Sequence, residues 1–112
     1  MAKVTRGDAI KAATTAIDNL QDNDLVASAV RTSLDWLATE HPGRAVEVRV
    51  PPYRAVQILG GTTHRRGTPP AVVEMSAQTW LELFTKKLTW TDALSSGQVV
   101  ASGERSDLSE LF

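Results

Sequence analysis

Residues 45–59, AVEVRVPPYRAVQIL, carry the pattern that decides the fold. Valine alternates with charged residues over residues 46–50, which predicts a strand with one apolar and one polar face. The two prolines at 51–52 end that strand, because neither can donate a backbone hydrogen bond to a sheet. Residues 54–59 are expected to form the next strand, antiparallel to the first across a short turn.

Helical patterns precede these strands, and residues 1–43 are predicted to form a helical N-terminal part. The first helix is expected to begin at Asp8, whose carboxylate can cap it. The second helix carries a wide apolar stripe of Val26, Val30, Leu34 and Leu37. It should end at the His-Pro-Gly of residues 41–43, because proline disfavours a helical residue before it and glycine allows a left-handed exit.

Residues 44–112 are predicted to form the sheet and its lid helices, and no strand–helix alternation in the sequence supports a parallel sheet. Further strands are expected over residues 71–75 and 98–102, with a helix over 76–87 and a shorter one that Gly97 ends. The expected caps of these helices and of a closing turn are Ser76, Thr89 or Thr91, and Ser106. This order indicates an α+β fold, an antiparallel sheet with helices packed on one face.

Composition limits what the protein can be. The chain of 112 residues is predicted to be a single domain, 1–112, large enough to bury a core without disulfide bonds. The absence of cysteine excludes disulfides and thiolate metal sites and makes the cytoplasm the expected location. No apolar run is long enough to span a membrane. The net charge of −1 gives no reason to expect a nucleic acid as partner.

Positive charge is concentrated in residues 41–70, where five arginines stand against one glutamate. The loop 62–67, TTHRRG, belongs to this segment. His64, Arg65 and Arg66 could hold a phosphate or carboxylate headgroup by charge-assisted hydrogen bonds. Alternatively, the charges only keep an exposed loop solvated. The sequence leaves both interpretations open.

The sequence offers few catalytic residues. His64 is the one credible acid–base group, because His41 lies at a helix end where a structural role is expected. No cysteine is present, and no serine lies in a strained strand-to-helix turn, so no nucleophile stands out. No spacing of histidines and carboxylates matches a metal site. We therefore expect a protein that is not an enzyme and has no metal or cofactor.

Aromatic residues give the strongest functional hint. Trp80, Phe84 and Trp90 fall on helical segments that are predicted to face the sheet. Large aromatic side chains bury about 150–250 Å² each and can simply fill the core. They can also leave a gap beneath the helices. An apolar gap of about 300 Å³ or more, with polar groups at its mouth, is typical of a small-molecule site.

Three blocks of this sequence resemble the actinobacterial sterol-carrier-like proteins: EVRVPPY at residues 47–53, RGTPPAVVE at 66–74, and the spacing LTWxxALxxGxVxASG over 88–103. The later half is also similar to the C-terminal domain of mycothiol-dependent maleylpyruvate isomerases, which shares the sterol-carrier fold. The resemblance covers nearly all of residues 44–111. It implies an antiparallel sheet of about five strands, helices over one face, and an apolar tunnel between the layers.

The resemblance further implies an apolar ligand, such as a fatty acid, acyl-CoA or sterol-like lipid, carried without chemistry. The implied lining of the tunnel is Trp80, Leu83 and Phe84 as its roof, Trp90, Leu94 and Val100 beside them, and Ile58 on the sheet. Two alternatives stay open. The protein can be an interaction module with a filled core, in which the open face of the sheet or an edge strand mediates homodimerisation or docks a partner. It can also be an accessory domain that supplies His64 or arginines to a thiol-dependent enzyme. No integral membrane association is expected in any of these cases.

Overall fold

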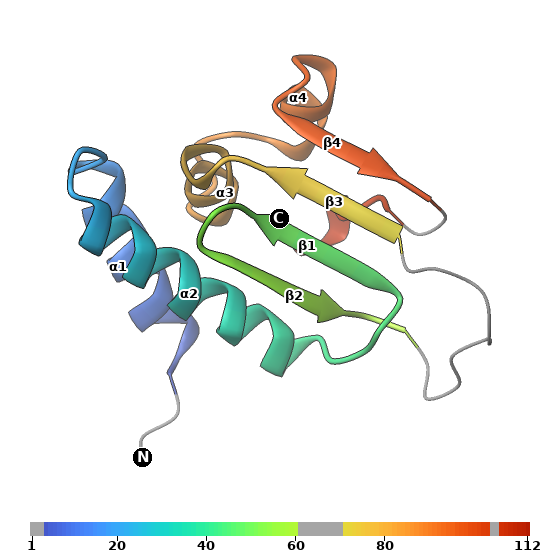
Figure 1. Cartoon of the computed structure of the whole chain (residues 1–112), viewed down its shortest axis with the longest axis horizontal. Helices are drawn as coiled ribbons and strands as arrows, with labels where there is room; N and C mark the ends of the chain where they lie inside the picture. Colours follow the sequence, from blue (N-terminus) through green and yellow to red (C-terminus); the bar gives the residue numbers. More distant parts are fainter. Residues whose placement is uncertain (1–3, 61–70, 104–105) are drawn as a thin grey trace.

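The computed structural model describes residues 4–60, 71–103 and 106–112. These residues form the α+β fold that the sequence predicts (Figure 1). Its elements are, in chain order, α1 (Arg6–Ile17), α2 (Asn23–Glu40), β1 (Val46–Val50), β2 (Arg54–Ile58), β3 (Ala71–Met75), α3 (Ala77–Phe84), α4 (Trp90–Ser95), β4 (Val99–Ser102) and the 3₁₀ turn η1 (Ser109–Leu111).

The four strands of the described residues form one sheet in the order β2-β1-β3-β4. The hairpin of β1 and β2 is antiparallel, as predicted, and so is the pair β3 and β4. The central pair, β1 and β3, is parallel, so the prediction of an antiparallel sheet is wrong for this pair. The reason is that Ile58 and Ala71 both pair with Val46, so β2 ends and β3 begins where β1 begins.

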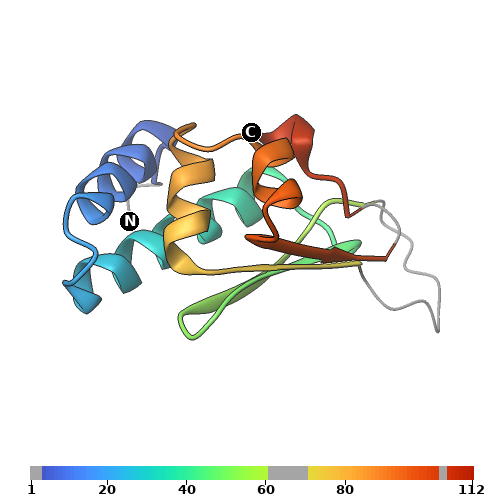
Figure 2. The same ribbon diagram turned by 90° about the horizontal axis from the view of Figure 1, so that it is seen from above.

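Helices cover one face of the sheet (Figure 2). The side chains that the strands direct toward this helical layer include Val46, Val48, Val50, Ile58 and Val73, all fully buried. Helix α2 packs on β2 and on α1, α3 packs on both N-terminal helices, and α4 packs on β4. The other face of the sheet has none of these helices over it (Figures 1 and 2). Because side chains alternate along a strand, the remaining strand residues project on that face.

Hydroxyl caps set most of the helix starts. Ser76 and Thr89 cap α3 and α4, as predicted. Helix α1 instead begins after Thr5, whose Oγ1 accepts a hydrogen bond from the backbone N–H of Asp8 at 3.0 Å. The Asp8 carboxylate accepts one from the N–H of Thr5 at 3.3 Å, so Asp8 completes a capping box and is not the cap itself.

Two further helix boundaries differ from the prediction. The turn η1 is held by the Asp107 carboxylate, which accepts a hydrogen bond from the N–H of Ser109 at 2.9 Å, so Ser106 is not its cap. Helix α3 ends at Phe84, because Lys86 adopts a left-handed conformation with φ of 64°. The chain therefore leaves α3 earlier than the apolar periodicity predicted.

Candidate functional site

Trp80 lies in the middle of the helical layer and is fully buried. Its indole Nε1 donates a hydrogen bond of 2.7 Å to the Oγ of Ser33 on α2. That hydroxyl in turn donates to the carbonyl of Ala29 at 2.7 Å. The indole also stacks on Phe84, with ring centroids 5.5 Å apart and planes 8° from parallel. Trp80 is therefore held as a core residue, with its one polar group satisfied.

Phe112 joins the two buried tryptophans of the C-terminal half. Its ring meets Trp80 edge-on, at a centroid distance of 5.7 Å, and stacks on Trp90 at 6.0 Å with planes 11° from parallel. Phe112 itself is only partly buried. Its backbone N–H makes a long hydrogen bond of 3.4 Å to the carbonyl of Ser109. Ring contacts therefore hold this side chain more than backbone structure does.

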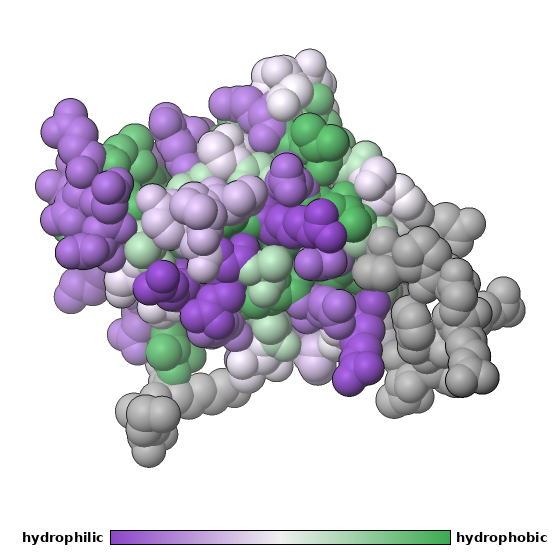
Figure 3. All heavy atoms as spheres, viewed as in Figure 1, coloured by the Kyte–Doolittle hydropathy of each residue, from purple (hydrophilic) through white to green (hydrophobic). Residues whose placement is uncertain are grey.

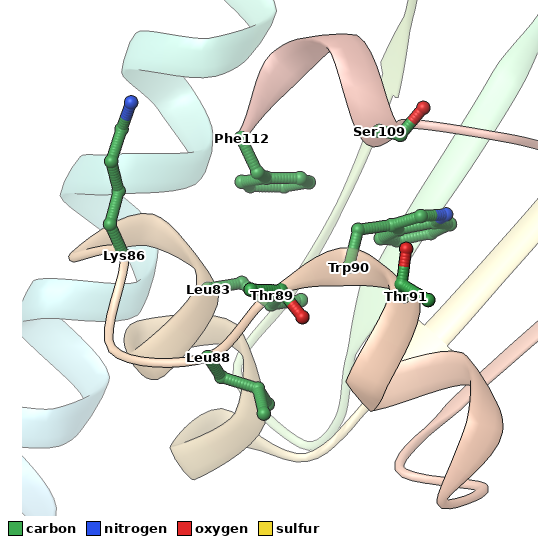
Figure 4. A pocket seen from close by; sticks show the side chains of 8 residues that line it. All are labelled: Leu83, Lys86, Leu88, Thr89, Trp90, Thr91, Ser109 and Phe112. Atoms are coloured by element: carbon green, nitrogen blue, oxygen red, sulfur yellow. The ribbon is translucent and has the colours of Figure 1, made fainter.

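A surface pocket of about 280 Å³ lies beside Phe112 (Figure 4). Its lining comes from the end of α3, the connection to α4, the start of α4, and η1: Leu83, Lys86, Leu88, Thr89, Trp90, Thr91, Ser109 and Phe112. No strand residue is among these. The pocket is thus a feature of the helical layer and opens to solvent, unlike the tunnel between sheet and helices that the resemblance implied.

The lining of this pocket is divided between apolar and polar groups. Leucine side chains and the rings of Trp90 and Phe112 provide the apolar part, and three hydroxyls lie among them. Lys86 stands at one end of the pocket and Ser109 at the other (Figure 4). No carboxylate of the described residues lines it, so its electrostatics favour an anion over a cation.

Trp90 carries the one buried side-chain donor that lacks a hydrogen-bond partner among the residues that the structure describes, its Nε1. The nearby Asp107 has a lowered pKa, first because the backbone N–H of Ser109 donates to its carboxylate, then because of the Ser109 side chain. The Trp90 indole contributes least to the lowering of this pKa, and its Nε1 makes no hydrogen bond with a described residue. Asp107 thus couples η1 to the wall of the pocket.

This coupling predicts an acid-sensitive turn. A carboxylate whose pKa is depressed in the folded state stabilises it above the ordinary value of about 4, and that contribution is lost as the pH falls through the folded pKa. We expect tryptophan emission to change reversibly below about pH 4, where Asp107 releases Ser109 and Phe112 moves from Trp90. Asp107→Asn should abolish this step, and an identical acid step in that variant would contradict the assignment.

The structure places the seven predicted lining residues in three different surroundings. Leu83 and Trp90 line the pocket. Trp80, Phe84 and Ile58 are buried in the core. Leu94 and Val100 are 40% and 65% exposed, so these two do not face an interior space.

Alternation along a strand explains the position of Val100. Val99 pairs with Met75 on the helix side of the sheet, and Val100 pairs with Glu74 on the other. Val100 therefore cannot lie beside Trp80. Leu94 is on the solvent side of α4, whose buried residues are Trp90 and Ala93.

The proposed headgroup contacts His64, Arg65 and Arg66 lie outside the described residues, so their role stays a prediction. Among the residues that are described, no three histidine or carboxylate side chains gather closely enough to hold a metal ion. Within the same residues, no helix has the length and apolar character needed to cross a bilayer.

The sequence pattern did not indicate Phe112 or Lys86 as parts of a site. Phe112 is separated from Leu83 by a helix and a strand, and only the return of the chain over α4 brings them together. Lys86 reaches the pocket because α3 ends early and the chain turns left-handed there. The sequence does show a lysine directly after an apolar helix. It does not show in which direction that side chain points.

Comparison with known proteins identifies a family. Residues 22–112 match the family described as "Bacterial SCP ortholog". No curated protein matches the chain. The match covers every strand, η1 and all the helices except α1.

Proposed function

Because the chain belongs to the family of bacterial sterol-carrier-protein orthologues, we propose that it binds an amphipathic anion with one apolar chain, such as a fatty acid, and carries it without chemistry. The observation that supports this most directly is the pocket beside Phe112, whose lining combines apolar side chains with three hydroxyls and a lysine at one end. A carboxylate headgroup would sit at Lys86, and its chain would lie between the leucines and the two aromatic rings.

The size of the pocket limits the ligand. Its volume of about 280 Å³ is at the bottom of the range of about 300–1,000 Å³ for small-molecule sites. One short chain fits this space, and a rigid ring system the size of a sterol does not. A longer chain needs more room, and Phe112 is a partly buried wall whose backbone N–H makes a long hydrogen bond of 3.4 Å.

We propose that a long chain takes the place of the Phe112 ring between Trp80 and Trp90. Both indoles then keep an apolar neighbour, so the exchange leaves no void. Burying methylenes contributes about 0.8 kcal/mol each. Ten of them contribute about 8 kcal/mol, from which the cost of association is subtracted. This supports affinities in the micromolar to millimolar range.

The lack of catalytic groups around the pocket supports carriage over conversion. Hydroxyls and one lysine line it, but no imidazole, thiol or carboxylate of the described residues does. Proton transfer therefore lacks a base of suitable pKa at this place. The ligand should leave the protein unchanged.

Titration of tryptophan emission with decanoate tests the proposal. Wild-type protein should bind it saturably. Phe112→Ala should bind it several-fold more tightly and should tolerate longer chains, because the ring no longer competes for the space. Trp90 lines the pocket, so its emission reports occupancy.

Lys86→Gln tests where the headgroup lies. This variant should weaken decanoate about tenfold, the effect of losing one charge-assisted contact of about 1.4 kcal/mol, and leave decanol unchanged. Lys87→Gln is the matched control, because Lys87 is an exposed neighbour that does not line the pocket. Absence of saturable binding in both wild type and Phe112→Ala would overturn the proposed function.

A further inference from the structure

The uncovered face of the sheet carries a row of four side chains, one from each strand. Ala55 of β2 pairs with Arg49 of β1, and Arg49 pairs with Glu74 of β3. Glu74 pairs with Val100 of β4. Paired residues project from the same face, so these four side chains form a line across the sheet. Figure 3 shows this face, where hydrophilic and hydrophobic side chains lie next to one another.

The two ends of this row differ in shape: Val100 projects into solvent at one end, and Ala55 lies in a hollow at the other. Val100 is 65% exposed, more than any other large hydrophobic side chain that the structure describes. The opposite end opens into a hollow of about 350 Å³ at the β1–β2 turn. Its lining consists of Arg49, Pro51, Pro52, Tyr53, Arg54, Ala55 and Glu74. The row therefore has an exposed apolar side chain, Val100, at one end, two opposite charges in the middle, and a hollow toward the other end that both charged residues help to line.

We propose that this face binds a second copy of the same chain, face to face, around a two-fold axis that runs along the strands between β1 and β3. Such an axis superposes the row on that of the second copy in reverse order. Arg49 then faces Glu74 of the second copy, and Glu74 faces its Arg49. Val100 faces Ala55 of the second copy and enters the hollow there. Each contact occurs twice.

The other simple two-fold arrangement fits the face less well. An axis across the strands, placed between this row and the next, would put Glu74 opposite Val72 and Val100 opposite Ser102, because these residues neighbour one another along β3 and β4. It would also put Arg49 opposite Glu47 of the second copy, the same residue with which Arg49 makes an ion pair of 3.2 Å in its own chain. Val100 would then lie away from the hollow, which would stay empty. Only the axis parallel to the strands brings Val100 to the hollow beside Ala55, and this favours that axis.

The area of the face sets the strength of the contact. Four short strands at a spacing of about 4.8 Å and a rise of about 3.3 Å per residue present roughly 300 Å² per copy. The total of roughly 600 Å² is below the 1,200 Å² of a stable complex, so the dimer forms only at high protein concentration. The pocket beside Phe112 belongs to the helical layer and stays open in this dimer.

Charge reversal tests the proposal by sedimentation equilibrium at millimolar protein concentration. Wild-type protein should self-associate. Arg49→Glu and Glu74→Arg should each weaken association at least tenfold, because like charges then face each other across the axis. A mixture of the two variants should associate again, because each new charge meets its opposite on the other chain. A folding defect cannot produce this recovery.

Arg31→Glu provides the control, since it makes the same charge change on an exposed position of α2 away from this face. It should leave association unchanged. Wild-type protein that stays monomeric at millimolar concentration would overturn the proposal, and so would a mixture of variants that fails to recover association.

Cross-linking tests the direction of the axis. The chain has no cysteine, so introduced thiols are the only reactive ones. Ala55→Cys mixed with Val100→Cys should be joined by a thiol cross-linker that reaches about 10 Å, the distance between packed sheets. Val100→Cys protein on its own should not be cross-linked, because the two introduced thiols of its dimer lie three strand spacings apart along the interface. Efficient joining of Val100→Cys to Ser102→Cys would overturn the proposed axis.

Discussion

Replacing Trp80 by alanine is expected to lower the free energy of unfolding by about 3–5 kcal/mol, much of the 5–15 kcal/mol that such a domain has in total. The indole is fully buried, stacks on Phe84 and supports Phe112. Its removal leaves a void that the two remaining rings cannot fill. Urea denaturation followed by circular dichroism should show the loss, and the melting temperature should fall on the order of 15 °C.

Trp80→Phe separates packing from hydrogen bonding. This substitution keeps an aromatic ring on Phe84 but removes the hydrogen-bond donor to Ser33. It should lower the free energy of unfolding by about 1–3 kcal/mol. Combined with Ser33→Ala, it should cost less than the sum of the two single changes, because the two groups are partners. A loss below about 1 kcal/mol for Trp80→Ala would mean that the helical layer is not packed around this indole.

Gly43→Ala should destabilise the protein by roughly 2–4 kcal/mol, from backbone strain and lost hydrogen bonds together. Gly43 has a φ of 149°, and a Cβ there would lie 1.8 Å from the carbonyl oxygen of Leu59. That carbonyl accepts a hydrogen bond from Ala45, and the N–H of Leu59 donates one to His41, both at 2.9 Å. Relief of the clash must therefore displace the backbone that joins α2 to the end of β2.

Gly97→Ala is the matched control for this prediction. Gly97 also has a positive φ, 77°, but an added Cβ meets nothing within 4 Å. Its replacement by alanine should lower the free energy of unfolding by only about 1–2 kcal/mol, because the only penalty is conformational strain. Chemical denaturation of both variants gives the comparison, and equal losses would show that the close approach of Leu59 to Gly43 does not matter for stability.

The helices and strands were largely predictable because their signals are local. Alternating valines predicted β1, and the double proline predicted the turn to β2. Hydroxyl residues before apolar runs predicted the starts of α3 and α4. In each case the backbone conformation depends on a few consecutive residues, so the pattern suffices. The prediction of Asp8 as the cap of α1 was wrong because Thr5, the true cap, and Asp8 both have side chains that can cap a helix.

The candidate site could be predicted only in part. Bulky aromatic residues near positions 80–90 pointed to the C-terminal half, and Leu83 and Trp90 line the candidate pocket there. Whether an indole fills space or borders it depends on the neighbours that the fold brings in. Ser33, distant along the chain, ties Trp80 into the core, and Phe112 closes the space between the two tryptophans.

The sequence by itself determined the α+β class, the hairpin and the alternation that sends one set of strand residues inward. These properties follow from periodicity and from the limits that proline and glycine place on the backbone. Tertiary structure alone decided the parallel central pair, the position of the pocket outside the sheet–helix layer, and the line from Ala55 to Val100. Each of these depends on which distant segments become neighbours, and local patterns do not encode that choice.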